Sequence, residues 1–560
     1  MQRRGKKMKR YQIVAIVIIV AIVIGSVGIY MLFLPPPAPN VIIMGTTDSV
    51  ESSLDIAQSY DYFGWNTINS LSEGLVGIDP GSEAGPDDII PGLAESWSSS
   101  AGGTIWDFVL RQGVTFDGTR PFNASVVKYT FDRNCNLTGV GLAEPDGPQL
   151  NMGYADIIDN VTIIDEYNVR FYLHIPFAPF LQLMACTASF MIDPVKAPMD
   201  ELVPYAEGDA ENSHPGALGP FILESWTRVG GSDEEMRLVA NPHYWDAASG
   251  IPKTPTIILR FYASDSALAL AMTSGEIDIA YRQLTAQQIN TFRTNPDVRV
   301  WEGIGAQIQY LCFQQNIYPY NETPIRQAIT AALNRSHVCE TVFLGDFDPL
   351  YSMVPAGMAY HKPSFEQWGD ANYTATVDLL DPYGYNATHP LVVELYYENS
   401  GHYPQSAEQA AVYKSDLEAS GVITVNLHGL EWATYRTQRN AGTMPVFIYG
   451  WYPDYIDPDN YLFLPFASWL NLGYNETYPA GGVAQYNLWV DGRSATTSSA
   501  RETAYHDLQD LQADECSVIP LWQSGTIAVT KLTIHGVILD ISVLWRHWLL
   551  YIGPPATTGP

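Results

Sequence analysis

Residues 391–460 decide the fold of this chain, because strand and helix patterns alternate through them without a break. The stretch reads LVVELYY (391–397), QSAEQAAVYKSDLEASG (405–421), VITVNL (422–427), EWATYRTQRNAG (431–442) and MPVFIYGW (444–451), followed by YPDYIDPDN (452–460). The short runs rich in β-branched and aromatic residues predict strands, and the longer amphipathic runs predict helices. Strands and helices that alternate at this spacing predict a doubly wound α/β lobe.

The end of this stretch, GWYPDYIDPDN (450–460), crowds aromatic rings and aspartates together directly after a predicted strand. Ligands of α/β sheets gather beyond the carboxyl ends of strands. Rings offer large, rigid surfaces, and a carboxylate in a poorly hydrated site pairs strongly with a cation. We therefore expect a ligand site here, with the aspartates of the loop as candidate anions.

Other interpretations of the same segment remain open. Asp457 and Asp459 are expected to cap turns and helix starts, as aspartate often does in loops. A calcium site built from these aspartates would lack the glycine and the terminal glutamate of an EF-hand loop. Trp451 suits an ordinary core position about as well as a ligand wall.

The N-terminus predicts a membrane anchor. Residues 11–34 carry no charge, and at helical rise they span roughly 36 Å, enough to cross a bilayer. Basic residues fill the preceding tail, 1–10, which is therefore expected to stay in the cytoplasm. We predict an uncleaved, single-pass signal anchor, a proline-rich linker at 35–40, and an extracellular or periplasmic location for the rest of the chain.

Composition narrows the class of protein. The chain has 560 residues, 46% of them hydrophobic, and a net charge of −31. Such length predicts several domains, and such acidity argues against nucleic acid as a partner. The five cysteines show no CxxC spacing, so a zinc site is not expected. A single bridge between Cys135 and Cys186 is conceivable, although isolated buried thiols are the simpler expectation.

Several motifs, in one order, resemble the extracellular solute-binding proteins of family 5, the peptide- and nickel-type receptors of ABC importers. The resemblance extends from about residue 41 to 545. It is carried by PGLAESW (91–97), WDFVLRQGVTFDGTRPFNASVVKYTFDR (106–133), GALGPFILESW (216–226), RLVANPHYWDA (237–247), ALAMTSGEIDIA (269–280), TPIRQAITAALNRSHVCETVFLG (323–345) and GWYPDYIDPDN (450–460).

This resemblance implies a two-lobed α/β fold of the periplasmic-binding-protein type (type II, with an extra domain), in which a hinge lets the lobes enclose the ligand. The expected boundaries are lobe I at 41–80, 211–305 and 521–560, the additional domain at 81–210, and the α/β ligand-binding lobe II at 306–520.

The resemblance also implies site residues. Asp454 matches the aspartate that pairs with a peptide's ammonium group, and Trp451 and Trp432 match two tryptophans of the cleft. Gly450 and Tyr452 belong to the same loop as Asp454. The family also contacts its ligand shortly before a Glu-Gly-Leu triplet, which residues 73–75 match, and this adds Tyr60 and Tyr62 as candidates. Two departures stand out: Ile448 occupies a position where oligopeptide receptors can carry a basic residue, and Pro453 replaces a small residue.

The function implied is that of a receptor, without cofactor or catalytic residues, that delivers peptides to a permease with cytoplasmic ATPases; we expect a monomer. Oligosaccharides are a serious alternative ligand, since 14 Trp and 34 Tyr also suit stacking on sugars, and nickel chelates are a further one. An extracellular hydrolase is disfavoured because HExxH, GxSxG and P-loop motifs are absent from the sequence.

Overall fold

The computed structural model describes residues 40–80, 89–137, 147–216, 218–474, 482–542 and 544–555. Contacts group the chain from Ile42 onwards into one compact unit, separate from the preceding residues. The predicted basic tail and anchor (1–34), and the linker up to residue 39, lie outside the described residues. Within those that are described, no helix is long and apolar enough to cross a membrane.

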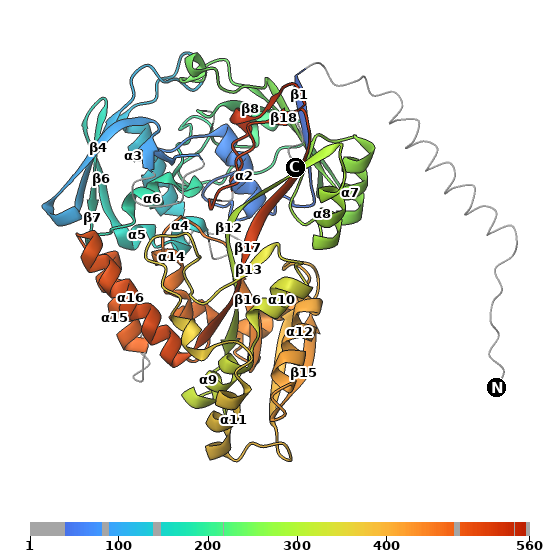
Figure 1. Cartoon of the computed structure of the whole chain (residues 1–560). Helices are drawn as coiled ribbons and strands as arrows, with labels where there is room; N and C mark the ends of the chain where they lie inside the picture. Colours follow the sequence, from blue (N-terminus) through green and yellow to red (C-terminus); the bar gives the residue numbers. More distant parts are fainter. Residues whose placement is uncertain are drawn as a thin grey trace, which may run out of the picture. The chain divides into compact units, whose positions relative to one another are not determined.

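One large mixed sheet organises the compact unit (Figure 1). Eleven strands form it within the described ranges, and β13 (Phe347–Pro349) pairs with β17 beside the main path. The other ten follow the order β15 (Ile423–Leu430), β14 (Leu391–Glu398), β16 (Val446–Trp451), β12 (Val298–Phe313), β17 (Val518–Lys531), β11 (Ile279–Tyr281), β1 (Val41–Thr46), β10 (Thr256–Phe261), β9 (Ser232–Ala240) and β8 (Phe221–Val229).

The long strands β12 and β17 belong to both halves of this sheet. Residues 308–313 of β12 pair with β16 and with the start of β17, whereas residues 298–304 pair with the end of β17, which also contacts β11. The β12–β17 ladder shifts register between Ile304 and Ile308. We call the side containing β14–β16 lobe II and the side containing β11, β1 and β8–β10 lobe I.

Close backbone approach explains the glycines at this break. A side chain on Gly305 would place its Cβ 2.5 Å from the Ser524 carbonyl oxygen, and one on Gly525 would place it 2.4 Å from that of Asp346. Real Cβ atoms do not tolerate such contacts, so both positions require glycine. This interruption of the ladder, with glycines on both strands, lies where β12 and β17 pass from one half of the sheet to the other.

Lobe II confirms the alternation predicted for 391–451. Strand β14 runs parallel to both β15 and β16, with α12 (Ser406–Glu418) and α13 (Trp432–Asn440) as the connections. The sheet is mixed, however, because β16 runs antiparallel to β12. Alternating side chains of β12 serve two cores: Leu311 packs on one face of the sheet, and Tyr310 on the other.

A second, antiparallel sheet lies within residues 94–173, apart from the main sheet in Figure 1. Its strands are β4 (Ala94–Ser100), β5 (Ile105–Leu110), β7 (Asn168–Leu173) and β6 (Ile158–Asp165), in that order. Two further strand pairs are β2 (Val76–Ile78) with β3 (Ile89–Pro91) and β18 (Ile534–His535) with β19 (Tyr551–Ile552).

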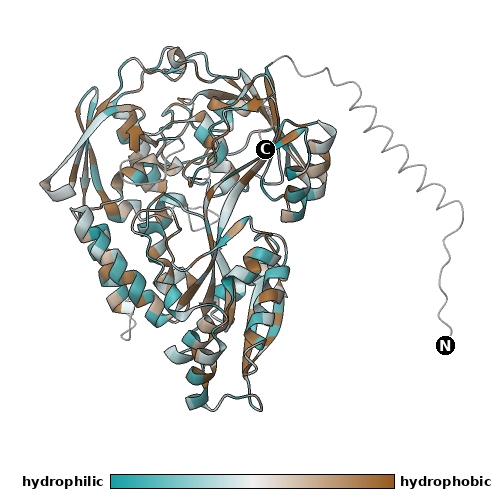
Figure 2. Ribbon diagram, in the orientation of Figure 1, coloured by the Kyte–Doolittle hydropathy of each residue, from teal (hydrophilic) through white to brown (hydrophobic). Residues whose placement is uncertain are grey.

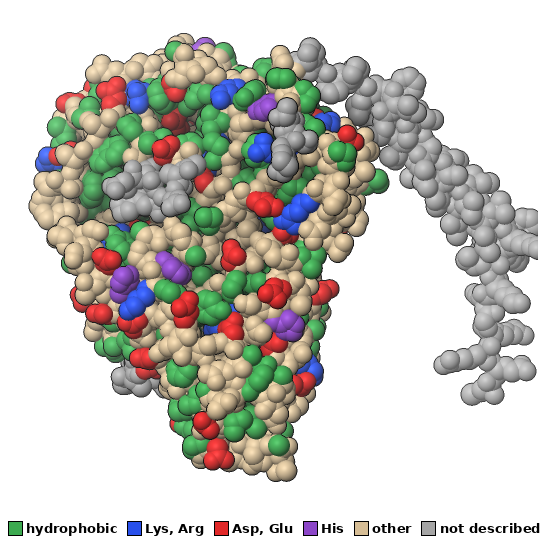
Figure 3. Space-filling model, viewed as in Figure 1, with side chains coloured by type: hydrophobic (Ala, Val, Ile, Leu, Met, Phe, Trp, Pro, Cys, Tyr) green, Lys and Arg blue, Asp and Glu red, His purple; other side chains and the backbone are tan. Residues whose placement is uncertain are grey.

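The remaining helices surround the sheets. Figure 2 shows hydrophilic residues along α15 and α16 and more apolar ones along the central strands, and Figure 3 shows acidic side chains spread over the visible face. These helices are α2 (Tyr62–Leu71), α3 (Ala124–Leu137), α4 (Pro148–Asn151), α5 (Tyr154–Ile157), α6 (Phe180–Ala185), α7 (Asp265–Ser274), α8 (Ala286–Arg293), α9 (Thr323–Ala332), α10 (Arg335–Thr341), α11 (Tyr373–Leu380), α14 (Asp459–Leu462), α15 (Gly482–Arg493) and α16 (Ser498–Glu515).

The five cysteines do not form disulfide bonds with one another. All five are free; Cys135 is partly exposed and the other four are buried. The bridge considered between Cys135 and Cys186 is therefore absent, and the simpler expectation is confirmed. Burial raises the pKa of both thiols to about 11, so they behave as small apolar side chains.

Candidate functional site

Asp454 connects the two lobes. It follows β16 in lobe II, and its Oδ1 accepts a 2.8 Å hydrogen bond from the hydroxyl of Tyr60, which precedes α2 in lobe I. Its Oδ2 accepts a 3.0 Å bond from the side chain of Asn460. The Asn460 oxygen in turn accepts bonds from the Asp454 backbone N–H (2.8 Å) and from the Trp451 indole N–H (3.1 Å). The carboxylate is thus held rigidly at the interlobe contact.

Neutral donors surround the charge of Asp454 in the described part of the chain. Burial raises the pKa of its carboxyl group to about 6, against the hydrogen bonds from Asn460 and Tyr60, which lower it. Within the described part of the chain no lysine, arginine or histidine forms an ion pair with it. A partly buried carboxylate served by neutral donors alone is suited to receive a cation from outside the chain.

A second interlobe contact lies beside the first. The rings of Tyr62 (lobe I) and Tyr452 (lobe II) have centroids 5.8 Å apart. The guanidinium of Arg282, just after β11, lies 4.0 Å from the Tyr62 ring centroid and 5.0 Å from that of Tyr452. Arg282 also donates to the Tyr452 hydroxyl at 2.9 Å, and that hydroxyl donates to Gln307 of β12 at 2.6 Å.

Gly450 and Trp451 belong to the aromatic packing of lobe II. Trp451 stacks on Trp469 with centroids 5.6 Å apart, and its ring meets the edge of Phe463. A Cβ at Gly450 would lie 2.7 Å from the Tyr403 ring, so this position requires glycine. Trp451 therefore takes part in the core and also orients Asn460, the partner of Asp454.

Trp432 lies in a neighbouring cluster. It begins α13 and stacks on His402 with a 3.7 Å centroid distance. Its connection to Trp451 runs through Tyr449 and Trp469, at 5.9 and 5.8 Å. The structure thus brings Tyr60, Tyr62, Tyr452 and Asp454 together directly, whereas Trp432 reaches this group only through other rings.

Asp457 and Asp459 have structural roles. Asp457 accepts from the Asp459 backbone N–H at 2.8 Å and forms a buried 2.5 Å ion pair with Arg501 of α16. Asp459 accepts from the Tyr455 hydroxyl at 2.6 Å and lies 3.4 Å from Arg493. The bond from the Asp459 backbone N–H makes Asp457 the turn cap expected of it, whereas the side chain of Asp459 contacts other side chains.

Sequence reasoning missed three residues of the site: Asn460, Arg282 and Gln307. Asn460 lies in the quoted motif, where the resemblance assigned it no role. Arg282 and Gln307 are far from that motif in the sequence, and only the sheet brings them to it. The one available signal was position, because Arg282 follows the strand ending in Tyr281 as Tyr452 follows the strand ending in Trp451.

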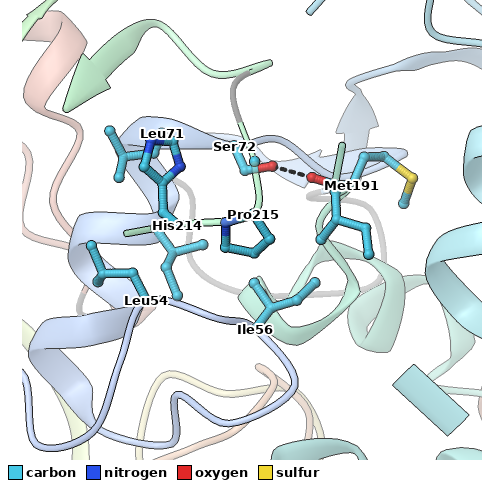
Figure 4. Close-up of a pocket in the computed structure, with 10 residues that line it drawn as sticks. Leu54, Ile56, Leu71, Ser72, Met191, His214 and Pro215 are labelled. Atoms are coloured by element: carbon cyan, nitrogen blue, oxygen red, sulfur yellow. Dashed lines mark hydrogen bonds between the residues drawn. The ribbon is translucent and has the colours of Figure 1, made fainter. Parts of the chain in front are cut away.

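The pocket drawn in Figure 4 is a different feature. It lies in lobe I and is largely apolar, with His214 and Ser72 among its polar residues. The Ser72 hydroxyl donates to the Met191 carbonyl oxygen at 2.5 Å across it. Burial lowers the pKa of His214 to about 3, so this ring is neutral. None of the pocket's residues belongs to the interlobe contacts around Asp454.

Comparison with known proteins identifies relatives along most of the chain. The family model for bacterial extracellular solute-binding proteins, family 5, matches residues 88–470. Di/tripeptide-binding protein 2 of Pseudomonas aeruginosa is 30% identical over 410 residues, which cover 71% of this chain and 73% of that protein. The probable D,D-dipeptide-binding periplasmic protein DdpA of Escherichia coli is 25% identical and covers 87% of this chain and 89% of its own length.

Solved structures share the two-lobed fold. The binding protein DppA of Helicobacter pylori, in complex with the peptide STSA, matches with a TM-score of 0.72, 21% identity and coverage of 92% of this chain and 98% of that one. NikA of Brucella suis, in complex with Fe(III)-EDTA, matches with a TM-score of 0.77, 19% identity and coverage of 92% and 100%. The chain therefore belongs to the bacterial extracellular solute-binding proteins, family 5, and is a substrate-binding protein, not an enzyme.

Proposed function

We propose that this chain is the surface-anchored receptor of an ABC importer, which captures di- or oligopeptides between its lobes and delivers them to a membrane permease. The observation that carries this proposal is the Asp454 carboxylate, held at the interlobe contact by neutral donors and without a cationic partner among the residues that the structure describes. The ammonium group of a peptide supplies that cation. The names of the two relatives, a di/tripeptide-binding and a probable D,D-dipeptide-binding protein, support peptides as ligands.

Capture proceeds by hinge motion about the break in the β12–β17 ladder. Tyr60 and Tyr62 come from lobe I, and Tyr452 and Asp454 from lobe II. A ligand that contacts both sets favours the closed form, because it gains interactions that the open form cannot offer. In the described conformation Tyr60 occupies one oxygen of Asp454, so the ligand either displaces this hydroxyl or shares the carboxylate with it.

The anchor is part of the proposal. Residues 11–34 have the length and the lack of charge of a membrane span, and the basic residues before them favour a cytoplasmic N-terminus. The receptor then acts as a monomer tethered beside its permease, with the lobes outside the cytoplasm. Protease protection of the N-terminal tail in intact cells, with digestion of the lobes, tests this topology.

A thermal-shift screen of the full chain in mild detergent tests the ligand class. We expect dipeptides or longer peptides to raise the melting temperature by mass action, and N-acetylated peptides to raise it less because they lack the ammonium group. Cello-oligosaccharides and a nickel–histidine chelate form the other arms. A shift with either of these, and none with peptides, would overturn the peptide assignment while leaving the receptor role intact.

A further inference from the structure

Asparagines in Asn-x-Ser/Thr triplets, the acceptor sequence for N-linked glycans, are unusually frequent in this chain. The chain has 25 asparagines, and its 71 serines and threonines among 560 residues would place about three of them in such triplets by chance. Eight are found: Asn123, Asn136, Asn160, Asn321, Asn334, Asn372, Asn386 and Asn475. Composition alone therefore does not explain the number of triplets.

The turn that contains Asn386 presents its triplet to solvent. Residues 386–389 follow α11 and are all exposed. Asn386 and His389 pair as an isolated antiparallel bridge, with two backbone hydrogen bonds of 3.0 Å. The rings of Tyr385 and His389 stack beside this bridge, with centroids 6.0 Å apart. The triplet thus forms the tip of a tight surface turn, the setting in which a large modifying group is tolerated.

Within this turn the two side chains that define the triplet bond to each other. The Asn386 Oδ1 accepts from the Thr388 hydroxyl at 2.7 Å and from the Thr388 backbone N–H at 3.0 Å. Its Nδ2 donates to the Gly384 carbonyl oxygen at 3.2 Å. An amide nitrogen carries two protons, and the exposure of the residue leaves the second one to water. The nitrogen that would receive a sugar is therefore accessible.

The triplet at Asn334 has the same sequence signature in different surroundings. Asn334 is the N-cap of α10, and its Oδ1 accepts from the His337 backbone N–H at 3.1 Å. The middle residue of the triplet, Arg335, is fully buried and forms a 2.7 Å ion pair with Asp370. An enzyme could reach this triplet only by unfolding the start of the helix. The fold thus separates two triplets that the sequence does not distinguish.

The turn at Asn386 also lies away from the interlobe contacts. Figure 1 shows α11, which precedes it, at the end of lobe II remote from lobe I, whereas α14, which follows the Asp454 loop, lies nearer to lobe I. A bulky, hydrated oligosaccharide at this end of lobe II would cover exposed surface without blocking ligand entry or lobe closure.

We propose that Asn386 carries an N-linked oligosaccharide. Transfer forms a bond between the Asn386 Nδ2 and the anomeric carbon of the sugar, and it breaks the bond from that carbon to a phosphate oxygen of a lipid-linked oligosaccharide donor. The lipid phosphate leaves with the electron pair, and a base of the transferase takes one amide proton. The proposal goes beyond peptide binding and shares with the proposed function only the location outside the cytoplasm.

Peptide mapping of the full chain tests this proposal. The protein is purified in detergent from membranes of the organism that encodes it, and its proteolytic fragments are analysed by mass spectrometry with electron-transfer fragmentation, which keeps a glycan on its residue. We expect the fragment with Asn386 to carry the added mass of a sugar chain in most copies. The fragment with Asn334 should have its unmodified mass.

Variants expressed in the same organism serve as controls. Asn386→Gln and Thr388→Ala should both lose the glycan at this turn, whereas Thr388→Ser should keep it because the hydroxyl remains. Asn399→Gln replaces another exposed asparagine, which stands outside any triplet, and should leave the glycan on Asn386 intact. Peptide affinity of Asn386→Gln should stay within about twofold of wild type, because the turn is remote from the Asp454 loop.

Three outcomes would overturn the inference. An unmodified Asn386 in the wild type refutes it, and the protease-protection experiment on intact cells then tells whether the location failed or the site alone. A glycan on Asn334 as abundant as that on Asn386 would mean that the fold does not select among the triplets. Added mass that persists in Thr388→Ala would mean that the modification does not depend on the triplet. Peptide binding stands or falls separately from each of these.

Discussion

Asp454 and Asp457 lie three residues apart in one loop, but their carboxylates have different kinds of partner. Asp457 is 3% exposed and forms a 2.5 Å ion pair with Arg501 of α16. Asp454 is held by a tyrosine hydroxyl and an asparagine amide, which are neutral. Among the described residues, the chain thus supplies a cation for the aspartate that stabilises the loop and none for the aspartate that contacts the other lobe.

This difference separates Asp457, a structural carboxylate, from Asp454, the proposed binding one. A buried ion pair contributes to stability only while both partners are present, and its removal leaves a charge in a poor solvent. A carboxylate left with neutral donors in such surroundings destabilises the folded protein at neutral pH and gains when a ligand brings a cation. Stability and affinity should therefore respond to substitution in opposite directions at the two positions.

The largest effect is expected from breaking the structural pair. Arg501→Met should lower the free energy of unfolding by about 3–5 kcal/mol at neutral pH, because Asp457 then stays buried without its cation. Urea denaturation followed by circular dichroism measures this loss. Arg299→Met, at an exposed arginine that stacks on Trp301, is the control and should change stability by less than about 1 kcal/mol. Equal losses in the two variants would remove the structural role.

The next largest effect is expected from Asp454→Asn, which should lower peptide affinity and raise the stability of the ligand-free protein. Asp454→Asn should weaken a free dipeptide by roughly 2–5 kcal/mol, since the bound ammonium loses its charged partner. The same substitution should raise the stability of the ligand-free protein by about 1–3 kcal/mol at pH 7.5, because the pKa of about 6 shows that the folded protein disfavours this charge.

Calorimetry with a dipeptide and with its N-acetyl derivative, together with thermal melts without ligand, measures both quantities. The acetylated ligand should bind wild type and Asp454→Asn alike, because it carries no cation. Unchanged affinity for the free dipeptide would exclude Asp454 from the ammonium site, and a less stable ligand-free variant would contradict the contrast with Asp457.

The pH dependence sharpens the same contrast. A raised carboxyl pKa means that Asp454 contributes stability that is fully present below about pH 4 and is lost as the pH rises through about 6. Peptide affinity should run the other way: constant above pH 7 and falling by up to about tenfold per pH unit below 6, as the carboxylate protonates. Calorimetry from pH 4.5 to 8 should show this slope in wild type and its absence in Asp454→Asn.

The smallest effect concerns the hydroxyl that reaches Asp454 from lobe I. Tyr60→Phe removes one neutral hydrogen bond and should change peptide affinity by about 0.5–1.5 kcal/mol. Since this bond lowers the pKa of Asp454, its loss should move the affinity midpoint to higher pH. Titration of the variant beside wild type checks the shift. A loss as large as that of Asp454→Asn would assign Tyr60 a major share of the binding energy.

Local pattern predicted much of lobe II correctly. The strands β14, β15 and β16 and the helices between them appear where the periodicity of 391–451 placed them, because burial on sheet and helix faces imposes different periods. The mixed character of the sheet was not predictable, since β12 and β17 join it from distant parts of the chain. The segment after 536 is mostly irregular where it is described. Its only described strand is β19, and its buried Asp540–Arg546 pair, at 2.8 Å, holds irregular backbone.

The sequence by itself determined the class of this protein: the order of its motifs, the alternation in lobe II and the aspartate-rich loop after a strand are all local. Only the tertiary structure decided which charges in that loop are paired. Arg501 neutralises Asp457, and Arg282 lies beside Tyr452, because sheet order and hinge geometry bring segments far apart in sequence into contact. Electrostatic pairing depends on distance and burial in space, and the spacing of residues along a chain does not encode either.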